Sequence, residues 1–304
     1  MKIHPTAIID STAQISETAV IGPYCIIGKR VKIGEDTILH SHVILEDETI
    51  IGEKNEIFQG VVIGTAPQDL SWRNEVSRVV VGNGNLIREY VTIHKGSGGK
   101  NTIIGDGNYI MAYVHAGHNV KIGSRCIIAN SVGLAGYVEL EDKVVMGGMA
   151  AVHQFVKIGT MAMVGGYSKN VKDIPPYVKV DGIPSRAYGL NLIALKRNEI
   201  PLENRELLKK AYNFLYRSGY NLCQAVEAIE HNLPSTVEIE RFLHFLRNPS
   251  RQGILSREFS KKAGYEHENG ADREVDQSAY FATEDLADVR LCTAGDRVDK
   301  LTSR

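Results

Sequence analysis

The chain of 304 residues has few of the features that mark metal-binding, secreted or membrane proteins. Its four cysteines are scattered, with no spacing typical of metal ligands, and they favour a reducing compartment, which we expect to be the cytoplasm. No apolar run approaches the roughly 18 residues of a membrane span, and the N-terminus lacks the apolar core of a signal peptide. The formal net charge of −1 argues against a globally basic nucleic-acid-binding protein.

The sequence is rich instead in a short repeat, because an aliphatic residue occupies every sixth position over long stretches. The first series holds eleven consecutive positions: Ile3, Ile9, Ile15, Ile21, Ile27, Ile33, Leu39, Leu45, Ile51, Ile57 and Ile63. The series returns at Val81, Ile87 and Ile93, then shifts by one position and continues from Ile104 to Val164. A fixed short period of this length indicates a solenoid rather than a compact domain.

Each hexad has a regular composition beyond its aliphatic residue. Glycine often follows the aliphatic residue, and the residue four positions after it is usually small or β-branched. We expect the aliphatic and compact residues to fill a narrow triangular core and the glycine to supply the positive φ of a corner. A helix would place successive members of this series about 240° apart, and a β-sandwich needs period-two strands. The pattern therefore predicts an all-β solenoid in which three hexads form one coil and coils pair in parallel, about 4.8 Å apart.

The repeat predicts how the chain is divided. We expect the solenoid over residues 1–186, with projecting loops near 65–78 and 96–100. A small α-helical domain is predicted over 187–257, with Asn221 and Ser235 as N-caps. Its helices are expected at Leu190–Asn198, Leu202–Tyr216, Asn221–Asn232 and Ser235–Asn248. Residues 258–304 are polar and are predicted to form a disordered tail.

Imidazole side chains are concentrated in the middle coils, at His94, His115, His118 and His153. One full coil separates His118 from Gly136, so we expect the ring to lie beside the Gly136 backbone. An imidazole can remove a hydroxyl proton near neutral pH, and a backbone N–H can stabilise a tetrahedral oxyanion. The pair is therefore a candidate general base and oxyanion donor for acyl transfer.

Three alternatives stand beside this hypothesis. The histidines could be stacked surface residues, or they could hold zinc between the coils of a trimer. The mixed neighbours Asn119, Tyr137 and Gln154 do not suggest a ligand set, so we expect neither a metal nor a cofactor. A non-enzymatic scaffold would instead show repetitive polar ladders on one face. No serine or cysteine lies beside a base and a carboxylate, which favours direct transfer over a covalent acyl-enzyme.

At this point the chain closely resembles the UDP-N-acetylglucosamine acyltransferases, which open lipid A biosynthesis. The matching stretches are Gln68–Leu70, Ile87–His94, Leu134–Gly136, Met149–Phe155, Met163–Gly166, Ile174–Val178 and Leu195–Arg197. The resemblance covers roughly residues 1–257. It implies a left-handed β-helix, a homotrimer with active sites between subunits, and an acyl carrier protein thioester as the donor.

The resemblance also implies roles for individual residues. His118 matches the general base of the family and Gly136 matches its oxyanion donor. The positions that contact the nucleotide sugar, UDP-N-acetylglucosamine, are Asp69, His94, His115, Gln154, Asn191 and Arg197. Gly166 matches the position that limits acyl length, and a glycine there implies room for a longer 3-hydroxyacyl chain. Basic side chains of the late coils and helices, among them Lys169, Lys196 and Lys210, are expected to dock the acidic carrier protein.

Three positions depart from the family pattern. Ser71 stands where the family usually has lysine, Asn119 where it has aspartate, and Tyr137 where it has histidine. These changes alter the charge beside the acceptor and leave two acceptors open, the 3-hydroxyl of the sugar or its 3-amino analogue. Sibling enzymes that N-acylate amino sugars carry an additional N-terminal domain, whereas this chain enters the repeat at Ile3, which argues against that assignment.

Overall fold

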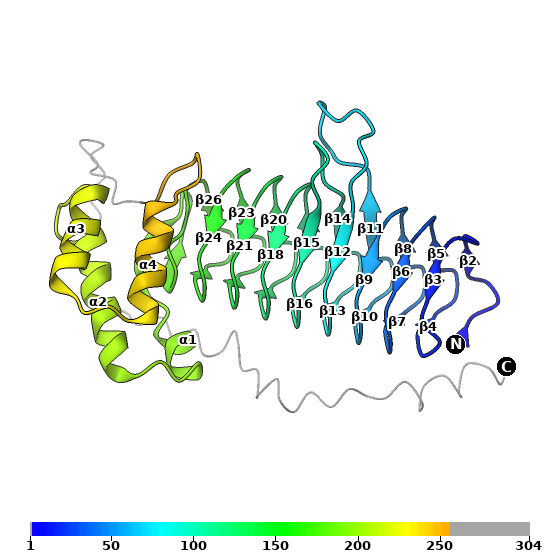
Figure 1. The fold of residues 1–304 in the computed structure, drawn as a ribbon, viewed down its shortest axis with the longest axis horizontal. Helices are drawn as coiled ribbons and strands as arrows, with labels where there is room; N and C mark the ends of the chain where they lie inside the picture. The colour runs from blue at the N-terminus through cyan, green and yellow to red at the C-terminus, as the bar shows by residue number, and fades with distance from the viewer. Residues whose placement is uncertain (1, 256–304) are drawn as a thin grey trace. The chain divides into compact units, whose positions relative to one another are not determined.

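The structure, a computed structural model, describes residues 2–255. These residues form a parallel β-solenoid of short strands, followed by a region of four helices (Figure 1). The predicted solenoid of hexapeptide repeats and the helical region after it are confirmed. The predicted disordered tail at 258–304 lies outside the described residues. Within residues 2–255, no helix has the length and apolar character needed to cross a membrane.

The strands form three sheets, because each coil contributes one strand to each sheet (Figure 1). The first sheet contains β1 (Lys2–Ile3), β4 (Val20–Ile21), β7 (Ile38–Leu39), β10 (Glu56–Ile57), β13 (Leu86–Ile87), β16 (Tyr109–Ile110), β19 (Ile127–Ile128), β22 (Val145–Met146), β25 (Met163–Val164), β27 (Val178–Asp181) and β28 (Arg186–Leu190). The second contains β2 (Ile8–Ile9), β5 (Ile26–Ile27), β8 (Ile44–Leu45), β11 (Val62–Thr65), β14 (Thr92–His94), β17 (His115–Ala116), β20 (Gly133–Leu134), β23 (Ala151–Val152) and β26 (Lys169–Asn170). The third contains β3 (Gln14–Ile15), β6 (Lys32–Ile33), β9 (Ile50–Ile51), β12 (Val79–Val81), β15 (Thr102–Ile104), β18 (Lys121–Ile122), β21 (Glu139–Leu140) and β24 (Lys157–Ile158).

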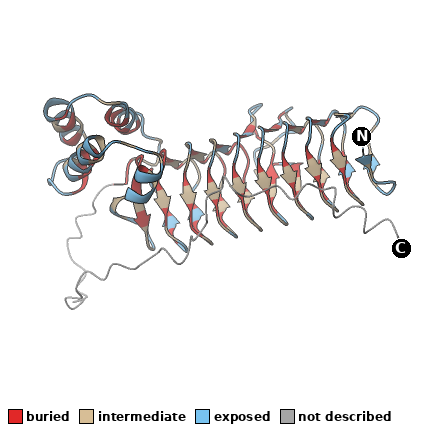
Figure 2. Ribbon diagram, turned by 90° about the horizontal axis from the view of Figure 1, so that it is seen from below, coloured by how far each residue is buried: buried red, intermediate tan, exposed pale blue. Residues whose placement is uncertain are grey.

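The core runs along the inside of the coils, as the hexads predict. Buried segments recur along the coils (Figure 2). The aliphatic residues of the repeat, such as Ile21 and Ile27, are buried, and so are the compact residues Ala19 and Cys25. Within each two-residue strand the first side chain faces outward and the second inward, because successive side chains of a strand alternate. Burial of two side chains per hexad is the main stabilising term of the solenoid.

The expected role of the glycines that follow the strands is wrong. The residues with left-handed φ lie two positions later and are mostly not glycine, for example Arg30 (φ 55°) and Glu48 (φ 67°). Gly34 is needed for a different reason, since a Cβ there would lie 2.6 Å from the Gly52 backbone of the next coil. The glycine therefore permits close stacking of neighbouring coils, while backbone hydrogen bonds such as Glu48 N–H to the Lys29 carbonyl (3.1 Å) support the corner.

Two inserted loops interrupt the coils, at the positions that the sequence predicts. Ile57 pairs with Ile87 and Ile87 with Ile110, so both coils are longer than the regular repeat. A ladder of three buried asparagines spans these coils: Asn55, Asn85 and Asn108. The Asn85 side chain donates to Asn55 Oδ1 at 3.0 Å, and the Asn108 side chain donates to Asn85 Oδ1 at 3.0 Å. Because each bond joins one coil to the next, the ladder fixes the register beneath the insertions.

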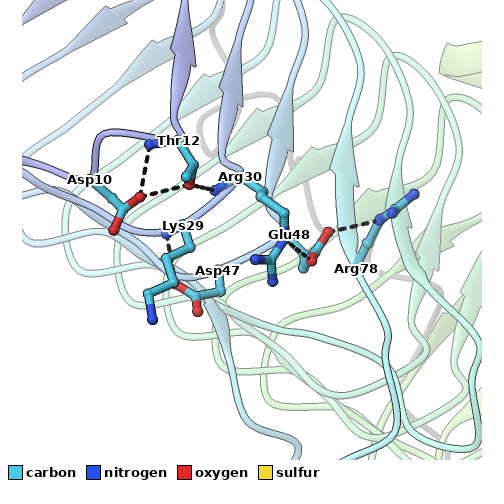
Figure 3. Close-up of polar contacts among 7 residues, drawn as sticks. All are labelled: Asp10, Thr12, Lys29, Arg30, Asp47, Glu48 and Arg78. Atoms are coloured by element: carbon cyan, nitrogen blue, oxygen red, sulfur yellow. Dashed lines mark hydrogen bonds and ion pairs between the residues drawn. The ribbon is translucent and has the colours of Figure 1, made fainter.

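Polar side chains cover one corner of the N-terminal coils (Figure 3). The Arg30 guanidinium bonds Glu48 at 2.5 Å, and Arg78 reaches the other oxygen of the same carboxylate at 3.3 Å. The Arg30 backbone N–H donates to Thr12 Oγ1 at 2.9 Å. The bond from Arg30 lowers the pKa of Glu48. The corner is solvent-exposed, so this ladder contributes little to stability.

The helices follow the predicted boundaries closely: α1 (Leu192–Arg197), α2 (Leu202–Tyr216), α3 (Leu222–Asn232) and α4 (Val237–Arg247). Asn221 caps α3 as predicted, but the residue that caps α4 is Thr236 rather than Ser235, whose hydroxyl instead donates to Glu240. After α4 the chain returns to the solenoid, where the Ser250 hydroxyl donates to the Asp173 carboxylate of the last coil at 2.7 Å. The division of these parts into separate domains stays a prediction.

Candidate active site

A cavity of about 670 Å³ lies on the outer wall of the middle coils. It is lined by stacked positions of three successive coils and by residues 68–70 of the first inserted loop. The lining residues are Gln68, Asp69, Leu70, His115, Gly117, His118, Gly133, Leu134, Ala135, Gly136, Ala151, Val152 and Gln154. The coil spacing thus brings four of the predicted site residues into one wall, His115, His118, Gly136 and Gln154, and the first inserted loop adds Asp69.

His118 lies directly against Gly136, as the spacing predicts. The His118 carbonyl accepts from Tyr137 N–H at 2.9 Å, and a Cβ added at Gly136 would overlap His118 Nε2. Within residues 2–255 the Gly136 N–H donates no backbone hydrogen bond. A side chain at Gly117 would come within 3.1 Å of that nitrogen, so the second glycine leaves the N–H open. The geometry therefore pairs an imidazole nitrogen with a free backbone donor, the arrangement that acyl transfer requires.

The other side of the His118 ring faces Asn119 and the second inserted loop. His118 Nδ1 lies 2.8 Å from Asn119 Oδ1, and Ser97 Oγ lies 3.4 Å from the same ring nitrogen. The Tyr137 ring meets the imidazole edge to face at a centroid distance of 5.3 Å. His118 is only 8% exposed, so these contacts hold the ring in a largely water-free position.

His94 and His115 form a second pair of imidazoles on adjacent coils. Their ring centroids lie 4.9 Å apart in an edge-to-face arrangement, and His115 Nδ1 lies 2.8 Å from Thr92 Oγ1. Burial, with the nearby rings of His115 and His118, lowers the pKa of His94 to about 4. Burial also lowers the pKa of His115. Both rings are therefore favoured in the neutral form near pH 7. His94 does not line the cavity.

Asp69 projects from the first inserted loop into the cavity. The Ser71 hydroxyl donates to its carboxylate at 2.7 Å and the Ser71 N–H at 2.9 Å. These bonds, with smaller contributions from Ser97 and from nearby His118, lower the pKa of Asp69 to about 2. The cavity therefore contains a carboxylate that stays ionised at neutral pH.

Besides His94, three predicted site residues do not line this cavity in the described chain. Asn191 is the N-cap of α1, accepting from Ala194 N–H at 3.2 Å, and it donates to the Met161 carbonyl at 3.0 Å. Arg197 is exposed in the last turn of α1. Gly166 is exposed one coil beyond Gly148. A single chain therefore assembles the predicted base and oxyanion donor but separates them from these residues.

Several residues near the site were not identified from the sequence. Ser97 contacts both His118 and Asn119 from a loop that the sequence marks only as rich in glycine and serine. Phe155 stacks on Tyr137 at 4.8 Å, and the Arg251 guanidinium covers Phe155 at 3.2 Å. The coil spacing could have placed Phe155 beside Tyr137, but no local signal connects Arg251 with this wall.

The zinc alternative was checked against the side chains of residues 2–255. Among the residues that the structure describes, no group of three or more His, Cys, Asp or Glu side chains is arranged to hold a metal ion. Cys126 is a core residue, and burial raises the pKa of its thiol to about 12.

Family models match three parts of the chain. Residues 173–255 match the second domain of the UDP-N-acetylglucosamine O-acyltransferases. Residues 101–136 match the bacterial transferase hexapeptide model of six repeats, and residues 3–97 match the GMPPB C-terminal domain.

Named relatives cover most of the chain. The acyl-(acyl-carrier-protein)–UDP-N-acetylglucosamine O-acyltransferase of Gloeothece citriformis is 47% identical over 199 residues, which are 64% of this chain and 72% of that protein. The Burkholderia orbicola protein of the same name is 48% identical over 226 residues, covering 74% of this chain and 86% of the relative.

Solved structures agree with these matches. The UDP-N-acetylglucosamine acyltransferase of Francisella novicida superposes with a TM-score of 0.82 at 38% identity, covering 88% of this chain and 100% of that one. LpxA from Acinetobacter baumannii gives a TM-score of 0.80 at 40% identity, covering 83% of this chain and 99% of that one. Taken with the matched family models and named relatives, this similarity shows that the chain is an acyltransferase and belongs to the UDP-N-acetylglucosamine O-acyltransferase family.

Proposed function

We propose that this protein transfers a 3-hydroxyacyl chain from an acyl carrier protein thioester to the 3-position of the glucosamine ring of UDP-N-acetylglucosamine, the first step of lipid A biosynthesis. The names of its relatives support the substrates. The observation that carries the proposal is the contact between the His118 ring and the open N–H of Gly136 in the cavity wall. A scaffold protein would need neither group.

The proposed reaction is a direct transfer. His118 Nε2 takes the proton of the sugar 3-hydroxyl as its oxygen attacks the thioester carbonyl. The Gly136 N–H donates to the oxyanion of the tetrahedral intermediate. When the intermediate collapses, the carbon–sulfur bond breaks, and the carrier thiolate takes the proton from the imidazolium. The base is thereby restored, and no cofactor is consumed.

We propose that Asp69, His94, His115 and Gln154 hold the nucleotide sugar. Asp69, His115 and Gln154 line the cavity, while His94 lies behind His115 and positions that ring. The carboxylate of Asp69 can accept from sugar hydroxyls, and neutral imidazoles can donate or accept.

Asn191 and Arg197 belong to the same proposed site but are contributed by a neighbouring subunit of a homotrimer. Both lie away from the cavity of their own chain, and an arginine suits a diphosphate through paired, charge-assisted bonds. The outward side chains of the first sheet support burial against another copy, because six of them are apolar: Val20, Ile38, Leu86, Ile127, Val145 and Met163. We propose a left-handed sense for the solenoid, as the resemblance implies.

The acyl chain and its carrier would approach from the C-terminal coils. Gly166 is exposed, and a Cβ there would lie 3.3 Å from the Gly148 carbonyl, so a side chain would fill space on the outer surface of this coil. We propose that the glycine admits a longer 3-hydroxyacyl chain. Exposed cations of the late coils and helices, including Lys169, Lys196 and Lys210, would dock the acidic carrier protein, and a cytoplasmic location stays a prediction.

A second acceptor, the 3-amino analogue of the sugar, is favoured by one observation. Ser71 stands beside Asp69 and donates to it, and the described residues that line the cavity include this ionised carboxylate but no lysine. Such a carboxylate would attract an amine that binds as an ammonium group. Transfer to that amine would be an N-acylation with the same base and oxyanion donor.

Acyl transfer from a panel of 3-hydroxyacyl carrier-protein thioesters to both acceptors tests the proposal. We expect transfer to one acceptor, lost in His118→Ala and kept in His42→Ala, a matched control at an exposed corner of an early coil. Absence of transfer to either acceptor, from a protein shown to be folded and trimeric, would contradict the proposed function.

Mixed trimers test the shared site. If one subunit supplies His118 and its neighbour Arg197, then equal mixing of His118→Ala and Arg197→Ala chains restores about one quarter of the wild-type sites. Each variant alone has none. Activity that stays at the level of the separate variants would show that both residues act within one chain.

A further inference from the structure

The second inserted loop closes onto the coil that carries His118. Ser77 Oγ donates to the Gly96 carbonyl at 2.6 Å, and Ser97 is buried. A Cβ at Gly96 would lie 2.8 Å from Asn119 Nδ2 and would overlap the Lys100 carbonyl oxygen. Only a glycine therefore lets the loop approach the Asn119 side chain this closely.

The backbone of Ser97 forms hydrogen bonds with both the oxygen and the nitrogen of the Asn119 side-chain amide. The Ser97 N–H donates to Asn119 Oδ1 at 3.0 Å, and the Ser97 carbonyl accepts from Asn119 Nδ2 at 3.0 Å. The Ser97 hydroxyl also donates to Oδ1, at 3.1 Å. A backbone N–H can only donate and a carbonyl can only accept, so the amide fits in a single orientation.

The oriented amide decides which nitrogen of His118 carries the proton. Asn119 Oδ1 lies 2.8 Å from His118 Nδ1 and can only accept, so in the neutral ring Nδ1 bears the hydrogen. Nε2 then keeps its lone pair, and it is Nε2 that lies against Gly136. An amide turned the other way would donate to Nδ1 and place the proton on Nε2, which could then accept nothing from a substrate.

The orientation of Asn119 should strongly affect the rate, because an asparagine can turn either its amide oxygen or its amide nitrogen toward the ring, whereas both atoms of an aspartate carboxylate are oxygens. In serine proteases an asparagine in place of the carboxylate lowers kcat about 10⁴-fold, because it stabilises the wrong tautomer of the base. Here the same residue type stands beside the base, and the loop backbone decides which of its two groups faces the ring.

We infer that Ser97 is a positioning residue, which acts through Asn119 to hold His118 in the tautomer whose Nε2 can accept the substrate proton. This Ser97–Asn119 clamp rests on the proposed function, in which His118 is the base. It assigns a role to the loop at residues 96–100 and accounts for the neutral Asn119 at this position.

Two variants test the clamp by activity. Gly96→Ala pushes the loop away and frees the amide, so we expect kcat to fall about 10²–10⁴-fold with little change in KM. Gly98→Asn is the matched control in the same loop: Gly98 has φ 62° and no atom within 4 Å of its added Cβ, and asparagine tolerates that conformation. Its kcat should match the wild type.

The decisive variant is the double substitution Gly96→Ala/Asn119→Asp. The two oxygens of a carboxylate are equivalent and both accept, so the ring nitrogen meets an acceptor whichever way the side chain turns. We expect kcat to recover at least about tenfold over Gly96→Ala alone. A double variant that is folded and trimeric but as slow as Gly96→Ala would overturn the inference, because damage to the loop alone would not be repaired by aspartate.

A readout that needs no substrate separates this inference from the proposed function. In protein labelled with ¹⁵N-histidine, the resonances missing from His118→Ala identify the ring. We expect a protonated Nδ1 and an unprotonated Nε2 in the wild type, and the opposite or a mixture in Gly96→Ala. A wild-type ring with its proton on Nε2 would overturn the clamp. The expected tautomer in a protein without acyl transfer would instead overturn the proposed function alone.

Discussion

One corner of the solenoid is used in two different ways. Between the second and third sheets, the N-terminal coils place the ion pair of Arg30 and Glu48, whereas the later coils place Asn119, Tyr137 and Phe155 at the same corner. The backbone is nearly the same in both halves, with φ values of 55° and 67° in the first and of 60°, 61° and 70° in the second. Backbone geometry alone therefore does not distinguish a solvated corner from one that borders the candidate site.

The difference comes from the two inserted loops, which both leave the solenoid at this corner. One lies between β11 and β12, the other between β14 and β15. In the early coils the Arg30 side chain is 58% exposed, while Asn119 beneath the second loop is 4% exposed. Shielding from water strengthens hydrogen bonds and fixes side chains, so the loops turn a solvated corner into a preorganised one.

The largest effect on activity is expected from a substitution at the contact between His118 and Gly136, in the coils that the inserted loops shield from water. Gly136→Ala places a Cβ against His118 Nε2 and displaces the ring from the oxyanion donor. We expect kcat to fall about 10²–10⁴-fold, as for loss of a base or an oxyanion donor. Steady-state kinetics beside a thermal melt measure this, and a folded variant with wild-type kcat would contradict the assigned pair.

A smaller effect is expected at the boundary between the two halves, where the asparagine ladder holds the interrupted coils in register. Asn85→Val removes the oxygen that accepts from both the backbone N–H and the side-chain amide of Asn108, and leaving these buried donors unpaired costs about 1–3 kcal/mol for each group. Asn55 Oδ1 still accepts from the Asn85 backbone N–H. Urea unfolding measures the loss. The control is Cys126→Val in the same inner column, which keeps the backbone bond to Asn108 and should cost less than about 1.5 kcal/mol. Equal losses in the two variants would contradict a role for the ladder in register.

The buried His94, in the coils beside the inserted loops, should make the stability of the protein depend on pH. Burial holds the folded pKa of His94 at about 4, below the ordinary value of 6.5, so the unfolded chain binds this proton first as the pH falls. Stability should drop by at most about 2 kcal/mol between pH 7 and pH 5 relative to His94→Gln. Unfolding of both proteins across this range measures the difference, and parallel curves would show that His94 does not titrate on unfolding.

The smallest effect is expected from breaking the exposed half. Arg30→Ala removes an ion pair in which the arginine is largely exposed, so stability should change much less than in Asn85→Val and kcat should not change. Urea unfolding and acyl-transfer rates check both statements. A loss comparable to that of Asn85→Val would mean that the exposed corner is as important as the ladder beneath the loops.

Much of the fold was predictable because the repeat converts spacing into contact. The hexads predicted the solenoid, its buried positions and the two insertions, and helical periodicity predicted α2 with its exact bounds, Leu202–Tyr216. The same spacing predicted that His118 lies beside Gly136. These inferences succeed because parallel coils with a constant period leave almost no freedom in which residues become neighbours.

Other features could not be derived from spacing. The sequence suggested that the glycines after the strands form the corners, but neighbouring coils leave no room for a Cβ at positions such as Gly34. The path of the inserted loop decides that Ser97 reaches Asn119, because a loop of glycine and serine has no periodicity to follow. Asn191 likewise matches the family's sugar-binding pattern, yet in its own chain it caps a helix.

By itself the sequence determined the solenoid, the level of the candidate site along it and the contact of His118 with Gly136, because all three depend on a fixed period. Only the tertiary structure decided how the site is finished: how Ser97 orients Asn119, how Arg251 covers Phe155, and which residues stay outside the cavity. These contacts join segments with no common period, so they follow from the paths of the loops and from packing rather than from spacing.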